Sequence, residues 1–361
     1  MVKKEIFVTK PFLPPIKEYE KYIAEIFKST QLTNEGPYVL ELQKKLKDFL
    51  NVPNLEYVTN GTIALQIAIE SLEISGGEII TTPFTYIATI SSIIWQKCKP
   101  VFVDIEPNNF TIDCNKIEKA ITANTRAILP VHVFGYACNI EKIAEIAKEY
   151  NLKVIYDAAH AFGSSYKGKS LLSYGDISTC SFHATKVYHT IEGGCCVTPF
   201  NQISKKISLI KKFGHIGDKF YLVGINGKQS EFNAAMGLVN LKYLTNCIQR
   251  RKIVSEKYDY FLSNKVGRPC RQKDLSYNYS YYPVVFKSFD VLKKVNNNLL
   301  KDGIHIRRYF YPSLNKLGFY DKFFNCPISE DISSRIACLP LYPDLSSNSV
   351  ELISNLINEI I

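Results

Sequence analysis

The feature that most constrains the fold is an alternation of short apolar runs and helix-like stretches between residues 56 and 200. Apolar runs of strand length occur at 56–59, 78–82, 100–105, 126–133, 152–157, 176–183 and 194–200. Helix-like segments separate several of them, as in "TIALQIAIESL", at about 86–97 and in "NIEKIAEIAKEY". This alternation predicts an α/β fold with a mainly parallel central sheet that helices cover on both faces.

The regions that flank this block predict further helices and a second domain. Helical periodicity occurs at 16–28, at 38–50 and over about 229–262. The strand candidate 281–286, a helix near 289–302 and the segment "GIHIRRYFY" then indicate a smaller α+β domain. We therefore expect a large domain over residues 1–245 and a small C-terminal domain over 246–361.

Composition excludes several classes of protein. With 46% hydrophobic and 22% charged residues, the chain is typical of a globular protein, and its start does not resemble a signal peptide. It has no apolar run of membrane-spanning length, so we expect a cytoplasmic protein with no membrane partner. Ten cysteines without a CxxC pair and six histidines without an HExxH motif predict reduced thiols and no metal site.

The formal charge of +10 at pH 7 does not by itself indicate a nucleic-acid partner. The lysines are interspersed with acids, as in "EKIAEIAKEY", and they form no long basic block. This pattern favours a solvated basic surface, together with a small anionic substrate such as a nucleotide diphosphate.

Polar residues follow the ends of three predicted strands, and ligands of open α/β sheets bind at such ends. These residues are the Asn60-Gly61-Thr62 turn, Asp157 and Ser181. A glycine lets the backbone approach an anion closely, and the start of the following helix favours a bound anion by about 0.3–1 kcal/mol. Taken singly, each also fits an ordinary structural role, namely a strand–helix turn for Gly61 and a helix N-cap for Asp157.

Lys186, in "SFHATK", gives this group of residues a chemical meaning, although a lone lysine is usually a surface residue. An anion cradle, a carboxylate at a strand end and a lysine are the parts of a pyridoxal 5′-phosphate (PLP) site. There the lysine forms a Schiff base with the cofactor, and the carboxylate of Asp157 pairs with its protonated ring nitrogen. The released amine of Lys186 then moves protons during amino transfer. We therefore predict Lys186 and Asp157 as catalytic residues.

The chain resembles the DegT/DnrJ family of PLP-dependent sugar aminotransferases, which have the type I aspartate aminotransferase fold. The resemblance rests on "DAAHAFG", "SFHATK", "EGG" and "GINGKQSEFNAAMG", and it extends from "VTKPFLPP" to "CLPLYPDL". The segments "PFLPP" and "SFHATKV" particularly resemble the dTDP-4-amino-4,6-dideoxyglucose transaminases of that family.

The resemblance implies roles for further residues. His160 would hydrogen-bond the phenolic oxygen of the cofactor, and Tyr86 would stack on its ring. The phosphate-binding positions match Gly61, Thr62 and Ser181, and Asn226 matches an asparagine that reaches the phosphate from the neighbouring subunit. A homodimer with shared active sites is therefore expected. Glu192 is expected to support the lysine loop.

The resemblance also implies a reaction, in which L-glutamate donates its amino group to C4 of a dTDP-linked 4-keto-6-deoxyglucose for surface polysaccharide (O-antigen) biosynthesis. Two alternatives remain open, a 3-amino sugar transaminase and a transaminase of a UDP-linked 4-keto sugar. A PLP-dependent dehydratase is disfavoured by Lys186, and a non-enzymatic scaffold by the presence of both Lys186 and Asp157.

Several residues have no settled role at this stage. His189 stands where relatives commonly have asparagine, and the choice between a substrate contact and a loop histidine satisfied by backbone stays open. His215 belongs to a region that often borders the sugar pocket, whereas His132 is expected to be structural. Arg307 and Arg308 either bind a substrate anion or face solvent.

Overall fold

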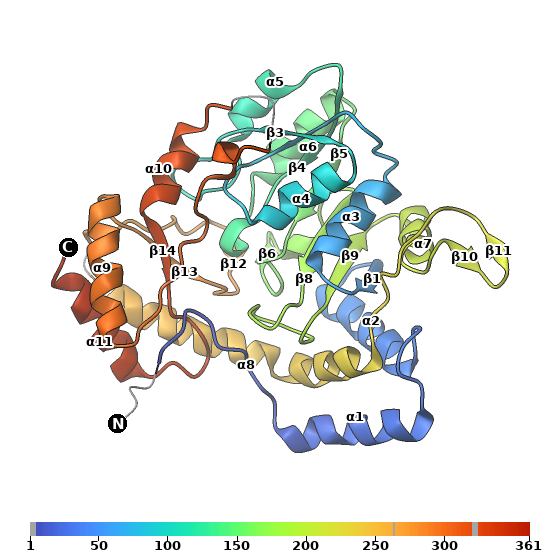
Figure 1. The fold of residues 1–361 in the computed structure, drawn as a ribbon, viewed down its shortest axis with the longest axis horizontal. Coiled ribbons are helices and arrows are strands. Elements are labelled where there is room, and N and C mark those ends of the chain that lie inside the picture. The colour runs from blue at the N-terminus through green and yellow to red at the C-terminus, as the bar shows by residue number, and fades with distance from the viewer. Residues whose placement is uncertain (1–4, 263, 320–323) are drawn as a thin grey trace.

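The large domain is built on a seven-stranded sheet. The computed structural model describes residues 5–262, 264–319 and 324–361 (Figure 1). In spatial order the strands are β1 (Asn54–Val58), β9 (Gly194–Thr198), β8 (Ile177–Ser181), β5 (Lys153–Asp157), β4 (Thr125–Leu129), β2 (Glu78–Thr81) and β3 (Lys99–Phe102). Strand β9 runs antiparallel to β1 and β8, while the other neighbouring pairs are parallel. The expected mainly parallel sheet is thus confirmed.

Helices bury both faces of this sheet. Successive residues of a strand point to opposite faces, and every residue of β9 and the last four of β5 are buried. The helices of the large domain are α1 (Ile16–Ser29), α2 (Pro37–Leu50), α3 (Gly61–Ser71), α4 (Ile87–Trp95), α5 (Ile117–Ala120), α6 (Ile140–Glu149) and α7 (Asn201–Ile210). Of these, α3 packs on β8 and β9, α7 on β1, and α4 on β3.

The small domain contains the antiparallel pair β13 (Tyr282–Val285) and β14 (Ile336–Leu339) and four helices. The helices are the far half of α8 (Glu231–Phe261), α9 (Phe289–Lys301), α10 (Pro327–Arg335) and α11 (Ser347–Asn358). Residues of α8 up to Leu244 belong to the core of the large domain, and those from Val254 onward belong to the core of the small domain. This change of partner supports our proposal that the domains meet near residue 245.

Several details differ from the sequence-based expectation or were not anticipated. The strand expected at 126–133 ends at Leu129, because Pro130 has no N–H with which to continue the ladder. Ile6 forms a β-bridge with Ile304, so the first described residues lie against the small domain. Two small sheets were also not anticipated: the hairpin β10 (His215–Ile216)–β11 (Lys219–Phe220), and β6 (Ser165–Tyr166) with β7 (Lys169–Ser170) and β12 (Leu275–Ser276).

Two features bear on the class of protein. Within the described ranges, none of the helices combines the length and the apolar character that crossing a membrane requires. All ten cysteines are free thiols, and nine of them are buried.

Candidate active site

A cavity of about 840 Å³ opens at the carboxyl ends of the parallel strands. Because β1, β5 and β8 run in the same direction, the residues that follow them meet at one edge of the sheet. Seven of the eight residues expected at the site line this cavity: Gly61, Thr62, Tyr86, Asp157, His160, Ser181 and Lys186. The eighth, Asn226, does not line it. The sequence motifs thus converge on one cavity, although they are far apart in the chain.

Asp157 is the last residue of β5, and its carboxylate is held by two donors from different elements. The Thr89 hydroxyl donates to Oδ2 at 2.8 Å, and the backbone N–H of Ala159 donates to Oδ1 at 3.1 Å. The side chain is 5% exposed. Burial raises the pKa of Asp157, whereas Thr89, Ala159 and the ammonium of Lys186 act to lower it. The carboxylate is therefore fixed in orientation and is available to a cationic partner.

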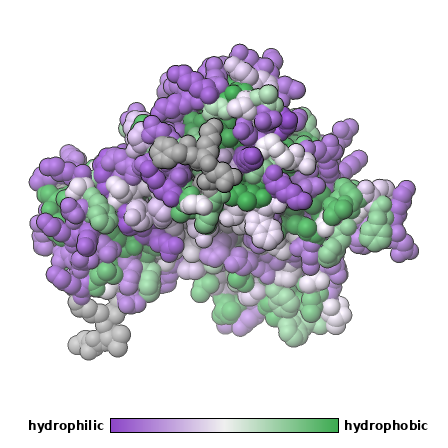
Figure 2. All heavy atoms as spheres, turned by 45° about the horizontal axis from the view of Figure 1, so that its top comes forward, coloured by the Kyte–Doolittle hydropathy of each residue, from purple (hydrophilic) through white to green (hydrophobic). Residues whose placement is uncertain are grey.

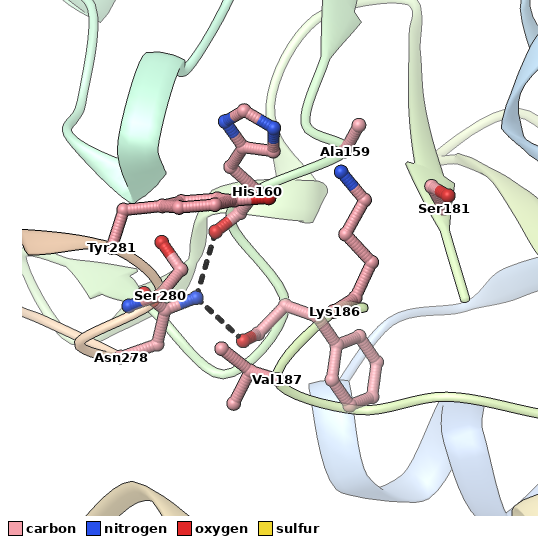
Figure 3. Close-up of a pocket in the computed structure, with 9 residues that line it drawn as sticks. Ala159, His160, Ser181, Lys186, Val187, Asn278, Ser280 and Tyr281 are labelled. Carbon is pink, nitrogen blue, oxygen red and sulfur yellow. Dashed lines mark hydrogen bonds between the residues drawn. The ribbon is translucent and has the colours of Figure 1, made fainter. Parts of the chain in front are cut away.

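Lys186 lies in the loop between β8 and β9, and its amine points to the side of the pocket on which Ala159 and His160 lie (Figure 3). Its Nζ lies 6.0 Å from the centre of the Tyr281 ring, which comes from the small-domain side of the cavity. Burial lowers the pKa of Lys186, although Tyr309 and Asp157 oppose this shift. A lowered pKa raises the fraction of neutral amine, which is the nucleophilic form.

His160 presents one defined nitrogen to the pocket. The backbone N–H of Phe134 donates to Nδ1 at 3.1 Å, so the proton of the neutral ring lies on Nε2. Burial, assisted by the charge of Lys186, holds the pKa of His160 well below its usual value. Asn278 fixes the backbone at this position by donating to the carbonyl oxygens of His160 and Phe162 (Figure 3). His160 is therefore a neutral hydrogen-bond donor.

The start of α3 forms a cradle for an anion. Asn60 caps the helix, because its side chain accepts the N–H of Ile63 at 2.8 Å. The N–H groups of Gly61 and Thr62 belong to the first turn, which has no helical acceptors for them. A Cβ on Gly61 would lie 2.9 Å from the Cβ of Ser181, so glycine is needed for the start of α3 to lie this close to Ser181. The backbone N–H groups of Gly61 and Thr62 and the hydroxyls of Thr62 and Ser181 thus lie around one small part of the cavity.

The lysine loop is fastened to this cradle by backbone contacts. A Cβ on Gly194 would come within 2.6 Å of the Asn60 carbonyl, which explains the second glycine of "EGG". The side chain of Gln229 donates to the carbonyls of Thr59 and Glu192, at 3.1 and 2.6 Å. The Glu192 carboxylate also lies 3.5 Å from Nε2 of His183. These contacts support the expectation that Glu192 holds the loop, through its carbonyl as well as its side chain.

Tyr86 and Asn226 differ from the other expected cofactor residues in their exposure. Tyr86 lines the cavity at the start of α4, but its side chain is 56% exposed. Asn226 is exposed in a projecting segment that we call the arm, residues 211–228, which includes the hairpin β10–β11 (Figure 1). Its Oδ1 accepts a hydrogen bond from Lys228 Nζ at 2.9 Å. Asn226 is thus not among the described residues that line the cavity.

The three histidines without a settled role lie outside the cavity. His189 is 3% exposed, and its Nε2 lies 2.7 Å from the carbonyl oxygen of Phe12 while its Nδ1 accepts the N–H of Ile191. It is a loop histidine satisfied by backbone and fastens the N-terminal segment to the lysine loop. His132 is buried and stacks on Tyr156, as expected of a structural residue. His215 lies on the arm, beside Phe220.

The structure separates the two arginines. Arg307 lines the cavity and lies over the ring of Tyr309, at 5.2 Å from its centre. Arg308 packs between Phe289 and Tyr311 and donates to the carbonyl of Ser334 at 2.9 Å. Arg307 alone of the two is placed to meet an anionic substrate.

The sequence did not single out two residues that shape the site. Thr89 lies three residues after Tyr86, so helical periodicity from Tyr86 could have placed it on the face that meets Asp157. Tyr281 packs against His160 with its ring tilted by 54° and ring centres 4.7 Å apart, and it lies beside Lys186. It carries no local signal, because it reaches the site only through packing of the two domains.

Comparison with known proteins assigns the family. The family model described as the "DegT/DnrJ/EryC1/StrS aminotransferase family" matches residues 15–358. The chain belongs to this family of aminotransferases. A relative from Shigella dysenteriae, named dTDP-4-amino-4,6-dideoxy-D-glucose transaminase, is 42% identical over 99% of this chain and 100% of its own length. A relative of the same name from Escherichia coli is 39% identical over 99% of each chain.

A solved structure supports the same assignment for the fold. The crystal structure of the protein DesI, in the presence of its TDP-sugar product, superposes on the aminotransferase with a TM-score of 0.93. The two proteins are 27% identical, and the match covers 98% of this chain and 92% of DesI. The expected aminotransferase fold and family are thereby confirmed.

Proposed function

We propose that the aminotransferase uses PLP to transfer the amino group of L-glutamate to C4 of dTDP-4-keto-6-deoxy-D-glucose. The product would be dTDP-4-amino-4,6-dideoxy-D-glucose, a precursor for surface polysaccharide such as O-antigen. One geometric observation carries the chemistry: the amine of Lys186 and the carboxylate of Asp157 face one cavity that also contains an anion cradle. The sugar is proposed from the names of the two relatives, which match over almost the full chain.

The residues of the cavity fit PLP. The cavity of about 840 Å³ has room for the cofactor, and the close packing of Gly61 on Ser181 brings the start of α3 beside the Ser181 hydroxyl, where a phosphate could bind. The buried carboxylate of Asp157 needs a cationic partner, and a protonated pyridine nitrogen would supply one. When bound, PLP supplies an aldehyde carbon that receives the amino group and a ring that takes up electrons from the α-carbon of the substrate.

Each cavity residue then has a defined task. Gly61, Thr62 and Ser181 would bind the phosphate, and the Nε2–H of His160 would donate to the phenolic oxygen of the ring. Asp157 would hold the proton on the ring nitrogen. The neutral amine of Lys186 would carry the α-proton of the amino acid, since burial lowers its pKa and so raises the fraction of neutral amine.

Arg307 is the residue that we assign to substrate carboxylate or diphosphate. It is exposed at the cavity wall, and its guanidinium can bind either anion in a bidentate manner. Tyr86 also lines the cavity, and its ring would cover one face of the cofactor.

We further propose that a second copy of the chain completes the site. The arm exposes apolar side chains, with Val223 89%, Phe220 74% and Ile216 64% exposed. Hydrophobic atoms also gather at the right-hand end of the molecule in Figure 2, where Figure 1 places the arm. Several exposed apolar side chains on one short segment are typical of a surface that is buried against another protein. In a homodimer of this kind, Asn226 of the partner subunit would reach the phosphate.

The visible absorption of the protein loaded with PLP tests the proposal. We expect L-glutamate to abolish the visible band of the bound cofactor and dTDP-4-keto-6-deoxyglucose to restore it. Loss of the band without recovery would contradict the proposed acceptor and favour a 3-keto sugar or a UDP-linked 4-keto sugar, each of which can be added in the same cuvette. A protein that never develops the band would contradict PLP itself.

A further inference from the structure

A chain of three side chains leads from the start of α4 to the carboxylate of Asp157. Thr89 lies in the first turn of α4 and is 0% exposed, and Thr85 is 2% exposed. The Thr89 hydroxyl lies 2.8 Å from Asp157 Oδ2, and the Thr85 hydroxyl lies 2.8 Å from that of Thr89. Neither threonine belongs to the residues that the sequence motifs assigned to the cofactor.

Donor chemistry gives this chain a direction. An ionised carboxylate only accepts hydrogen bonds, so Thr89 donates its single hydroxyl proton to Asp157. Thr89 has then no proton to offer Thr85, and Thr85 donates to Thr89. The order is therefore Thr85 to Thr89 to Asp157, with each hydroxyl polarising the next.

We propose that Thr89 is a positioning residue that keeps Asp157 ionised and oriented toward the cofactor ring, with Thr85 acting through Thr89. The part that concerns the cofactor rests on the proposed function, whereas the hydrogen bond to the carboxylate does not. The structure offers only one other fixed donor among the described residues, the N–H of Ala159.

The other titratable groups near Asp157 do not substitute for Thr89. They are Lys186, His160, His132, Cys138 and Cys180. Burial keeps the two histidines neutral and the two thiols protonated, because it lowers the pKa of the former and raises that of the latter. Among the described residues that act on the pKa of Asp157, Lys186 bears the one opposing charge, and in the proposed reaction its amine is required elsewhere during transfer.

The direction of the pH effect follows from burial. Burial raises the pKa of Asp157 above its value in the unfolded chain, so ionisation destabilises the folded state as the pH rises through the folded pKa. The Thr89 hydroxyl offsets part of that loss. Its removal therefore destabilises the folded state less in acid, where the carboxyl is protonated, than at higher pH, where the carboxyl is ionised.

The test compares melting temperatures of the full-length protein without cofactor from about pH 4 to about pH 8, a range that begins at the ordinary pKa of aspartate. Thr89→Val keeps the shape of the side chain. We expect it to lower the melting temperature roughly twice as much at the upper end of this pH range as at the lower end, since charge-assisted hydrogen bonds are roughly twice as strong as neutral ones. Thr89→Ser should restore the wild-type profile, and Asp157→Asn should remove the pH dependence of Thr89→Val.

Thr81→Val is the matched control. Thr81 is also 0% exposed, and its hydroxyl donates to the backbone carbonyl of Leu129 at 2.7 Å. Its loss should lower the melting temperature equally at every pH. The same pH-independent loss in Thr89→Val, or no rescue by Thr89→Ser, would overturn the proposal.

Two further measurements keep the inference separate from the proposed reaction. If Thr89→Val does not fold, Thr85→Val takes its place, and we expect a smaller loss of melting temperature that also grows with pH. A loss that is the same at every pH would then contradict the hydrogen-bond order Thr85 to Thr89 to Asp157. In the loaded enzyme, Thr89→Val should slow the step with L-glutamate by roughly 10–100-fold, as for residues that orient metal-bound ligands. If the wild type does not react with glutamate, the proposed function fails while the melting profiles still decide on Thr89.

Discussion

Two parts of the molecule carry residues expected to bind the cofactor, but they are built in different ways. One is the floor of the cavity, by which we mean Asp157, His160 and Lys186, and the other is the arm. At the floor, Asp157 and His160 are buried, and both carboxylate oxygens of Asp157 and the Nδ1 of His160 are paired with partners in the same chain. On the arm, Asn226 is exposed, and Val223 nearby is 89% exposed. The floor is complete within one chain, whereas the arm has the character of a surface that needs a second chain.

The arm is nevertheless firmly attached at its base. Lys211 is 0% exposed, and its Nζ lies 2.7 Å from Glu35 Oε1 and 2.8 Å from Glu56 Oε2. Burial acts to lower the pKa of Lys211, but the two carboxylates outweigh it, so the pKa lies above its usual value. The N–H of Gly227, near the other end of the arm, donates to the carbonyl of Lys211 at 3.0 Å. The ends of the arm, at Lys211 and Gly227, are thus held firmly by the large domain, while its tip around Val223 is exposed.

The largest effect is expected at the floor. Lys186→Ala should lower the rate of sugar amination by about 10⁴-fold or more, a loss comparable to that of other covalent nucleophiles. The measurement is the steady-state rate with L-glutamate and the dTDP sugar. Lys206→Ala, which removes a half-buried lysine paired with the exposed Glu73, should leave the rate unchanged, because Lys206 does not line the cavity. A Lys186→Ala enzyme with normal turnover would show that the floor is not the reaction centre.

The base of the arm should show a large effect on stability. Lys211→Met leaves Glu56 without its cationic partner and Glu35 with Lys212 alone, at a cost of about 3–5 kcal/mol in the free energy of unfolding. Urea titration at neutral pH measures this cost. Lys212→Met is the control, because Lys212 pairs with the same Glu35 but is 36% exposed, and its loss should cost less than about 1 kcal/mol.

The cost of Lys211→Met should also shrink in acid. Burial acts to raise the pKa of Glu35, but Lys211 and Lys212 outweigh it and hold the pKa below its usual value. The pair with Lys211 therefore stabilises the protein above the unfolded pKa of about 4.3 and is lost as the pH falls through the folded pKa. A cost for Lys211→Met that stays constant down to acid pH would argue against this ion pair.

The smallest expected effect concerns the exposed tip of the arm, at Val223. Val223→Glu should leave the stability of the single chain within about 0.5 kcal/mol, because the side chain is already 89% exposed. It should weaken self-association by at least about tenfold, since a hydrophobic contact at an interface would be replaced by a charge. Light scattering after size exclusion measures the association. Tyr260→Glu, at a side chain that is 82% exposed in the small domain, should leave it intact.

If Val223→Glu associated as strongly as the wild type, the arm would not be a surface that needs a second chain. The arm would then be an exposed loop of a chain that acts alone, and Asn226 would have no route to the cofactor. Weaker association together with weaker binding of PLP would instead link the tip to the phosphate site of a second subunit.

The sequence alone determined the sheet and the place of the cavity. The strand and helix periods repeat within short segments, so "LKVIYD" and "NIEKIAEIAKEY" predict their elements without any long-range information. Parallel strands place their carboxyl ends at one edge, and this geometry predicts that Gly61, Asp157 and Ser181 meet. The small sheet of β6, β7 and β12 was not accessible in this way, because it depends on packing between distant segments.

Only the tertiary structure decided which neighbours act on these residues. His189 fastens Phe12 across 177 positions of sequence, and Tyr281 reaches Lys186 from the other domain. Arg307 and Arg308 are adjacent in the chain, yet one lines the cavity and the other packs between aromatic rings. The physical reason is that local pattern fixes backbone conformation, whereas the pairing of a polar side chain depends on what folding brings within hydrogen-bond distance.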